Sequence, residues 1–236
     1  MKLSIVIPTL NEERTLETVI RRILQTPFPL DYELIIVDDH STDRTLAIAQ
    51  RLRQSVGTRR MVVVHNRVNK GKGACIRQGL KHATGELVIV QDADVEYHPA
   101  DIPALLPPVL TGQADAVYGS RFLTRRWPEG MAWPNYLANR LLTGLTNLLY
   151  GVRLTDMETC YKLMRREQLA RMRLRTARFE FEPEVTAKFL QGGGRIVEMP
   201  IGYHGRSRRE GKKIRAKDFL IALWVLFAAR AARSMR

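Results

Sequence analysis

Strand-length apolar runs alternate with amphipathic segments through the first 120 residues, and this alternation limits the folds that the chain can adopt. The apolar runs lie at Lys2–Ile7, Tyr32–Val37, Met61–His65 and Glu86–Val90. Helical spacing follows the first three runs, over Asn11–Gln25, from a cap near Ser41 or Thr42, and over Gly73–Ala83. Short strands that alternate with helices of about 10–15 residues predict βαβ units and a mostly parallel sheet with flanking helices.

The pattern becomes less regular after a further strand expected at Asp115–Gly119. Residues 120–135 are rich in Arg, Trp, Pro and Gly and predict a loop. Beyond it we expect helices at Tyr136–Tyr150, about Pro183–Leu190 and Phe219–Arg233, and strands at Cys160–Met164 and Arg195–Ile201. The sequence therefore predicts one α/β domain over residues 1–217, with halves at 1–119 and 120–217, followed by a C-terminal helix over 218–236.

The last expected helix is apolar on nearly every side from Phe219 to Ala229. A helix needs about 20 apolar residues to span a bilayer, so this one should not cross a membrane. Lys and Arg residues flank it on both sides. We expect it either to lie as an interfacial anchor on an anionic membrane or to pack on protein, and the sequence leaves both open.

Positive charge is concentrated in the second part of the chain. The net charge is +14, and residues 101–236 hold 24 Lys and Arg against 12 Asp and Glu. A basic surface can face nucleic acid, anionic lipid or phosphorylated substrates, and charge alone does not choose among them. The two cysteines are far apart, without metal-ligand spacing, and no apolar leader precedes the first strand. These features predict a cytoplasmic protein without a disulfide framework.

Acidic residues gather where three of the expected strands end. The first strand runs into Pro8–Glu12, the second into Asp38-Asp39, and the fourth into Asp92-Ala93-Asp94-Val95-Glu96. In open α/β sheets ligands bind beyond the carboxyl ends of the strands, so these segments should converge on one crevice. A D-x-D sequence at the end of a buried strand supplies carboxylates that suit Mg²⁺ beside a substrate diphosphate.

Ordered motifs along the chain resemble those of a known family. The first part of the chain resembles the nucleotide-binding half of family-two glycosyltransferases. The resemblance lies in the runs IVIPTLNEE, IIVDDHSTDRT, NKGKGACIRQGLKHATGE and VIVQDADVEYHPADI. The second part of the chain resembles dolichol-phosphate mannosyltransferases and their bacterial polyprenyl-phosphate relatives. The resemblance lies in the motifs VYGSRF, TDMETCYKLMRRE, FEFEPEVTAK and YHGRSRREGKKI. The resemblance extends to about residue 218 and implies a GT-A fold. It makes 1–119 the nucleotide-sugar-binding half, and 120–217 the acceptor-binding half with a basic lid loop.

The resemblance also implies a donor site. Its nucleotide-sugar-binding residues would be Pro8, Leu10, Glu12, Val37, Asp39, Asp92, Ala93, Arg206 and Lys212. Asp39 would hold the base or ribose, and Arg206 and Lys212 would belong to a flexible lid that closes over the diphosphate. A metal cofactor, Mg²⁺ or Mn²⁺, would be bound by Asp92, Asp94 and Glu96.

On the acceptor side, the resemblance implies that Arg121 binds a lipid phosphate, with Asn139 and Arg140 as further candidates. The catalytic residues that it implies are Asp94, Arg121 and Asp156. A phosphate monoester is largely ionised at neutral pH, because its second pKa is about 6. The reaction then needs positioning more than a general base, and Asp156 would orient a substrate or act as a base if one is needed.

Two further features do not settle a function. The sequence Gly71-Lys72-Gly73 is superficially similar to a phosphate loop but lacks the Walker spacing, so an NTPase is not favoured. Glu182 and Glu184 are expected either to contact sugar hydroxyls or to lie at the start of a helix.

The resemblance leads us to expect inverting, metal-dependent transfer of a hexose, with mannose favoured, from a nucleotide sugar to a polyprenyl or dolichyl phosphate. GDP-mannose is the favoured donor, and a UDP-sugar is the other candidate donor. This hexosyltransferase would be peripheral on the inner face of the cytoplasmic membrane, with any membrane-protein partner unknown. One alternative is a hydroxyl acceptor on a polysaccharide or glycolipid, with Asp156 as the base. A nucleic-acid-binding protein is disfavoured, because no binding motif accompanies the charge.

Overall fold

The computed structural model describes residues 1–58, 60–205 and 216–234. Its strands are β1 (Lys2–Thr9), β2 (Asp31–Asp38), β3 (Met61–His65), β4 (Leu87–Val90), β5 (Ala116–Ser120), β6 (Lys162–Arg165) and β7 (Ile196–Pro200). Its helices are α1 (Leu16–Gln25), α2 (Thr45–Val56), α3 (Lys72–His82), the 3₁₀ helix η1 (Pro99–Asp101), α4 (Ile102–Leu110), α5 (Trp133–Tyr150), α6 (Arg166–Arg171), α7 (Phe181–Gln191) and α8 (Ala216–Ser234).

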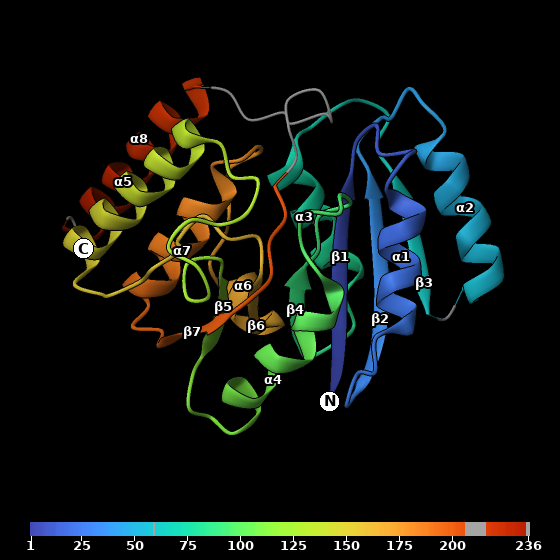
Figure 1. Cartoon of the computed structure of the whole chain (residues 1–236), viewed down its shortest axis with the longest axis horizontal. Coiled ribbons are helices and arrows are strands. Elements are labelled where there is room, and N and C mark those ends of the chain that lie inside the picture. The colour runs from blue at the N-terminus through green and yellow to red at the C-terminus, as the bar shows by residue number, and fades with distance from the viewer. Residues whose placement is uncertain (59, 206–215, 235–236) are drawn as a thin grey trace.

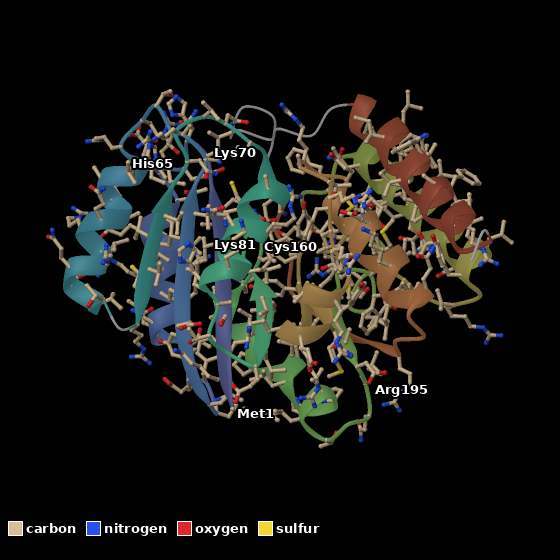
Figure 2. All side chains as sticks on the ribbon, turned by 180° about the vertical axis from the view of Figure 1, so that it is seen from behind. Met1, His65, Lys70, Lys81, Cys160 and Arg195 are labelled. Carbon is tan, nitrogen blue, oxygen red and sulfur yellow. The ribbon has the colours of Figure 1, made fainter. Side chains whose placement is uncertain are left out.

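The strands form one sheet in the order β3-β2-β1-β4-β6-β5-β7. The mostly parallel sheet expected from the sequence is confirmed, because β3, β2, β1 and β4 are parallel and β7 is parallel to β5. β6 is antiparallel to both β4 and β5. The carboxyl ends of β1 to β4 therefore lie along one edge, near His65 and Lys70 in Figure 2, with Met1 and Arg195 at the opposite end.

Helices cover both faces of the sheet. α1 and α2 pack against each other on one face, whereas α3 lies on the other face against β1 and β2 (Figures 1 and 2). β1 and β2 are covered on both sides, which explains why their central positions are apolar almost without interruption. α3 approaches the sheet closely at Gly79, where an added Cβ would lie 2.5 Å from Val6 Cγ1.

Two helices begin later than the sequence predicts. α1 begins at Leu16 instead of Asn11, because residues 10–15 form the turn that leaves β1. α2 begins at Thr45, whose backbone N–H donates to the Asp43 carboxylate at 2.9 Å, so the polar stretch near Ser41 lies before the helix. Both helices begin late for the same reason. The residues before each helix form the turns that follow the carboxyl ends of β1 and β2.

The C-terminal helix α8 packs along α5 and α7 at one end of the molecule (Figure 1). A small apolar cluster joins the three helices and contains Leu142, Met157, Ala187, Ala222 and Leu226. Packing on protein, one of the two expectations for this helix, is thus observed for its inner side. Within the described ranges, no helix is long and apolar enough to cross a membrane.

Candidate active site

The turns that follow β1 and β2 are joined by hydrogen bonds at the carboxyl edge of the sheet. Asn11, at a left-handed φ of 52°, accepts a hydrogen bond from the backbone N–H of Thr42 at 2.8 Å. The backbone N–H of Glu12 donates to Thr45 Oγ1 at 2.8 Å. Asn tolerates this backbone conformation better than most residues. These contacts bring the PTLNE turn beside the Asp38-Asp39 segment.

Asp39 holds the loop that leads into α3. Its carboxylate accepts hydrogen bonds from Asn66 Nδ2 at 3.0 Å and from the backbone N–H groups of Lys70 and Gly71 at 2.8 and 2.7 Å. The side chain is buried among these donors. Asp39 therefore fixes the loop before α3, and its contact with a base or ribose stays a prediction.

The segment with the D-x-D sequence folds back at the end of β4. Asp94 Oδ1 accepts a hydrogen bond from the backbone N–H of Glu96 at 3.0 Å, which closes a short turn. Glu96 Oε2 accepts one from the Tyr203 hydroxyl at 2.9 Å. Asp92 Oδ1 lies 2.7 Å from Lys72 Nζ, so α3 supplies a positive charge to the first carboxylate of the motif.

The carboxylates expected to bind a metal fit that role unequally. Among the residues that the structure describes, no group of three or more His, Cys, Asp and Glu side chains could hold a metal ion. Asp92 already faces the ammonium group of Lys72. Mg²⁺ often takes only one or two protein carboxylates and completes its shell with substrate phosphate and water. Asp94 fits a metal that arrives with a diphosphate, and Asp92 fits it less well.

Arg121 and Asp156 form a buried, bidentate ion pair. Arg121 Nε donates to Oδ2 and Nη2 to Oδ1, both at 2.7 Å. Asn139 Nδ2 donates to the same Oδ1 at 2.9 Å. Burial alone would raise the pKa of Asp156, but the Arg121 charge and these hydrogen bonds lower it below its ordinary value. Three of the predicted residues therefore meet in one cluster, and its carboxylate is a weak base.

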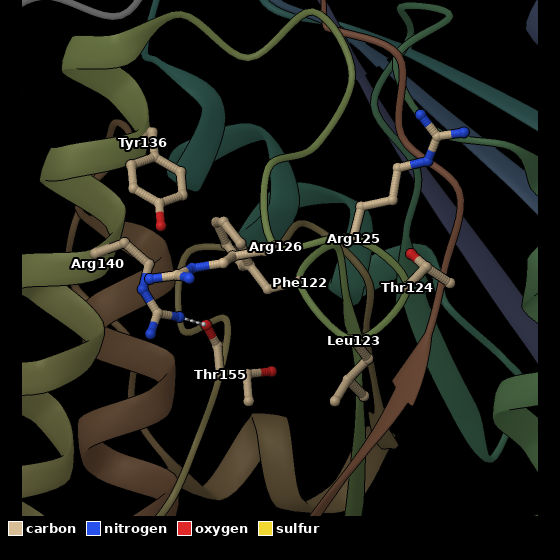
Figure 3. Close-up of a pocket in the computed structure, with 8 residues that line it drawn as sticks. All are labelled: Phe122, Leu123, Thr124, Arg125, Arg126, Tyr136, Arg140 and Thr155. Carbon is tan, nitrogen blue, oxygen red and sulfur yellow. Dashed lines mark hydrogen bonds between the residues drawn. The ribbon is translucent and has the colours of Figure 1, made fainter.

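A cavity of about 310 Å³ lies beside this ion pair at the start of α5 (Figure 3). Its lining consists of Phe122, Leu123, Thr124, Arg125, Arg126, Tyr136, Arg140 and Thr155. Arg126 and Arg140 extend toward each other, and Arg140 Nη1 donates to the Thr155 carbonyl oxygen at 3.2 Å. In the described part of the chain neither guanidinium forms an ion pair with a carboxylate. Two unpaired guanidiniums that share one cavity favour an anionic ligand.

The remaining predicted donor residues are distributed along the same edge. Pro8 and Val37 lie near the carboxyl ends of β1 and β2, and Leu10 lies in the turn after β1. Ala93 is buried between the two aspartates of the D-x-D sequence. Arg206 and Lys212, the predicted lid residues, lie outside the described residues.

Two buried charged residues near the site, Lys162 and Glu158, were not assigned from the sequence. Lys162 Nζ contacts Glu182 Oε2 at 2.5 Å, and burial raises the pKa of Glu158 to about 7. Only the presence of Lys and Glu in a segment of otherwise buried strand and helix residues could have indicated them. Glu184 instead accepts hydrogen bonds from the backbone N–H groups of residues 175 and 176, so of its two expected roles the structural one is observed.

The chain is similar to known proteins in sequence and in fold. The family model described as "Glycosyl transferase family 2" matches residues 4–173. A dolichol-phosphate mannosyltransferase of Pyrococcus furiosus is 30% identical over 216 residues, which are 90% of this chain and 59% of the relative. A dodecaprenyl-phosphate galacturonate synthase of Rhizobium johnstonii is 29% identical, covering 96% of this chain and 66% of the relative. The chain thus spans about six tenths of the length of these relatives.

Among solved structures, the glucosyl-3-phosphoglycerate synthase of Mycobacterium tuberculosis with Mn²⁺, UDP-glucose and phosphoglyceric acid is similar in fold. The TM-score is 0.73 at 23% identity, and the match covers 98% of this chain and 80% of the other. At that identity the likeness establishes the fold, not the substrates.

Proposed function

Because the chain belongs to glycosyl transferase family 2 and has a GT-A-like fold, we propose that it transfers a hexose from a nucleotide sugar to a polyprenyl phosphate. Two relatives are named for transfer to dolichol phosphate and to dodecaprenyl phosphate. Mannose is the favoured sugar, because the first relative is named as a mannosyltransferase, and the family resemblance favours GDP-mannose as its donor. A UDP-sugar is the other donor to test, because the similar solved structure contains UDP-glucose.

The position of the arginine-lined cavity is the observation that supports a lipid phosphate as the acceptor. It opens at the start of α5, the helix that packs beside α8. These two helices carry an apolar outer face, which we define by the exposed side chains Leu137, Leu141, Leu148, Leu220, Ile221, Trp224 and Phe227. A polyprenyl phosphate has an anionic head and a long apolar tail, so one ligand can use both features.

On the acceptor side, Arg126 and Arg140 hold the phosphate in this proposal. Arg121 adds to them, because a guanidinium carries five N–H donors and the pair with Asp156 uses only two through the side chain. Asp156 and Asn139 then fix the orientation of Arg121. The phosphate oxygen is already charged at neutral pH, so it can attack the anomeric carbon without a general base. This agrees with the lowered pKa of Asp156, which makes it unsuited to accept a proton.

On the donor side, the strand-end segments bind the nucleotide sugar. Asp94, with help from Glu96, would hold Mg²⁺ or Mn²⁺, which when bound neutralises the leaving diphosphate. Tyr203 donates to Glu96 and so ties the segment before the predicted lid to the D-x-D turn. In this proposal the displacement inverts the anomeric carbon, as the family resemblance implies.

The apolar outer face also supports peripheral contact with a membrane. Trp224 is 70% exposed and Leu148 is 81% exposed, which is costly in water for side chains of this size. Arg140, Arg153 and Arg230 are exposed on or beside the same two helices, and they favour an anionic lipid surface. We propose that this face rests on the membrane from which the acceptor is taken.

Transfer of labelled sugar to lipid tests the proposal. The protein is mixed with undecaprenyl phosphate in detergent and with GDP-mannose, UDP-glucose or UDP-N-acetylglucosamine, with Mn²⁺ or Mg²⁺. We expect label in the organic phase with at least one donor. Arg126→Gln and Arg140→Gln should each raise the KM for the lipid about tenfold, because a charge-assisted hydrogen bond contributes roughly 1.5–3 kcal/mol.

Arg195→Gln is the matched control, because Arg195 lies far from the cavity. Arg195 contacts Asp115, just before the start of β5, whereas the cavity residues begin after the end of β5. It should leave the KM for the lipid unchanged. Thermal stabilisation by the donor should be the same in all three variants. Label found only in a hydroxyl-bearing acceptor would refute the proposal of a lipid-phosphate acceptor. If no nucleotide sugar stabilises the protein against heat, the proposal of a nucleotide-sugar donor is refuted.

A further inference from the structure

Three aromatic side chains lie almost parallel to one another at the start of α5. We call Trp127, Trp133 and Tyr136 the aromatic stack. The ring centroid of Trp127 lies 4.4 Å from that of Tyr136 and 5.3 Å from that of Trp133, and the ring planes differ by 9° and 10°. Both tryptophans remain exposed, Trp127 to 44% and Trp133 to 58%. The stack therefore presents apolar ring surface to a ligand, and none of the roles described above uses either tryptophan.

The loop that carries Trp127 is held in place by hydrogen bonds and by a close backbone contact. Trp127 Nε1 donates to the carbonyl oxygen of Met131 at 3.0 Å. The backbone N–H of Gly205 donates to the carbonyl oxygen of Glu129 at 2.9 Å. Gly130 has a φ of 70°, and a Cβ added there would lie 2.4 Å from the Gly205 carbonyl oxygen. A surface that is fixed in this way loses little conformational entropy when a ligand binds.

Tyr136 joins the aromatic stack to the arginine-lined cavity. It lines the cavity together with Arg126 and Arg140, and its hydroxyl points toward these two guanidiniums in Figure 3. Arg140 follows Tyr136 by four residues on α5, so the two side chains lie on the same side of the helix. A phosphate bound by the two arginines would lie at the hydroxyl end of Tyr136. The group esterified to that phosphate can then extend along the ring toward the tryptophans.

A stripe of apolar side chains continues from the aromatic stack along α5. Trp133, Leu137 and Leu141 follow one another at intervals of four residues and therefore lie on one side of the helix. All three side chains are exposed, and the two leucines belong to the apolar outer face. The aromatic stack thus connects the cavity with that face. This is the path that a long apolar chain attached to a bound phosphate requires.

We infer that the aromatic stack binds the isoprene units next to the acceptor phosphate and selects an isoprenoid over a straight alkyl chain. This inference rests on the proposed polyprenyl-phosphate acceptor and adds the residues that recognise its chain. An unsaturated isoprene unit is flat about its double bond and carries a methyl group, so it can lie against the face of an aromatic ring. A straight saturated chain has no such flat part, and it loses more torsional freedom when a ring surface holds it.

Calorimetry with short, water-soluble phosphates tests the inference without detergent or membrane. Farnesyl phosphate and dodecyl phosphate have main chains of equal length, but only farnesyl phosphate is built from isoprene units. We expect the wild type to bind farnesyl phosphate about fivefold more tightly than dodecyl phosphate. Trp133→Ala should weaken the binding of farnesyl phosphate about tenfold and remove this preference. Trp133→Phe, which keeps an aromatic ring at the same position, should retain most of it.

Trp127→Ala should have the same effect, and it decides the matter if Trp133→Ala does not fold. Trp224→Ala is the comparison variant, because Trp224 is also an exposed tryptophan but lies on α8. It should leave the affinity for farnesyl phosphate unchanged.

Two results would overturn the inference while the proposed function stands. One is that Trp133→Ala weakens binding to lipid vesicles but not to farnesyl phosphate, which would make the aromatic stack a membrane contact. The other is that the wild type binds farnesyl phosphate and dodecyl phosphate with equal affinity. If the wild type binds neither phosphate and transfers no labelled sugar to undecaprenyl phosphate, both the inference and the proposed function are overturned.

Discussion

At the scale of single residues, buried charge in this protein is compensated by short contacts from distant segments. Asp156 is enclosed by Arg121 and Asn139, and Glu33 by donors from β1 and from the turn before β4. Removing one partner of a buried pair leaves the other charged and unsolvated, which costs more than the pair itself contributes. Substitution of such residues should therefore change stability, and pH should change it through their pKa values.

Asp156→Asn should destabilise the fold as well as disturb the acceptor site. The variant removes the negative charge that Arg121 faces in a buried site. We expect a loss of about 3 kcal/mol in the free energy of unfolding, or a drop of roughly 6–12 °C in Tm, measured by denaturant and thermal unfolding. An unchanged Tm would show that the pair contributes little.

Glu33 should make the protein lose stability in acid. Burial opposes its ionisation, but hydrogen bonds from Lys2, Ser4 and Thr84 outweigh burial and lower the pKa of Glu33 to about 2, from an ordinary 4.5. A carboxyl with a lowered pKa stabilises the fold above its unfolded pKa, and this contribution disappears as pH falls from about 4.5 toward 2.

The loss should be about 3 kcal/mol, on the basis of 1.36 kcal/mol for each pKa unit. Urea unfolding at a series of pH values measures it. Glu33→Gln should flatten the profile between pH 4.5 and 2, and Glu167→Gln, on an exposed residue, should not. A wild-type profile that is already flat in this range would contradict the assignment.

At the scale of elements, helix packing against the sheet depends on small residues at points of close approach. Gly79 in α3 faces Val6, and Gly144 in α5 has no atom near its open side. Gly79→Ala should cost about 1–3 kcal/mol in unfolding free energy, because the new Cβ would meet Val6 in a rigid core. Gly144→Ala should stabilise by about 0.5–1 kcal/mol through helix propensity. Equal effects in chemical unfolding would refute the packing argument.

The elements show how far the sequence could predict the fold. The apolar runs of β1, β2 and β4 predicted buried parallel strands, because covering on both sides demands apolar residues throughout. Helix α4 was not expected, because it contains Pro103, Pro107 and Pro108. The antiparallel position of β6 between β4 and β5 could not be predicted from the sequence either. The periodicity of apolar residues indicates which positions of a strand are buried, but not which strand lies beside it.

The same division holds for the site. The strand-end carboxylates could be placed together, because the order of parallel strands determines where their ends lie. Side-chain partners could not be placed. The pairing of Arg121 with Asp156 and of Lys72 with Asp92 depends on distances between segments that only the folded chain sets. The cavity between Arg126 and Arg140 has the same origin.

At the scale of the whole molecule, charge and apolar surface should act together on membranes. Binding to vesicles with anionic lipid should weaken as salt increases, because the attraction of exposed arginines is screened. It should not vanish, because burial of the apolar outer face does not depend on salt. Cosedimentation with vesicles of neutral and anionic composition measures both parts.

Trp224→Glu and Phe227→Glu should reduce vesicle binding at every salt concentration. Leu110→Glu is the control, since this exposed leucine lies at the end of α4, away from α5 and α8 (Figure 1). If the outer face instead joins two copies of the chain, the wild type will be a dimer in solution and Trp224→Glu a monomer. That result would contradict membrane docking by this face.

The position of β6 has a consequence for how the protein is made. Chain leaving the ribosome presents β1 to β4 early, but the strand that covers the free side of β4 arrives only at Lys162–Arg165. Until then β4 is an open edge made of Leu87, Val88, Ile89 and Val90, the kind of edge that recruits other chains. A chain truncated between residues 120 and 160 should therefore leave this edge of β4 uncovered and should aggregate more readily than the full chain.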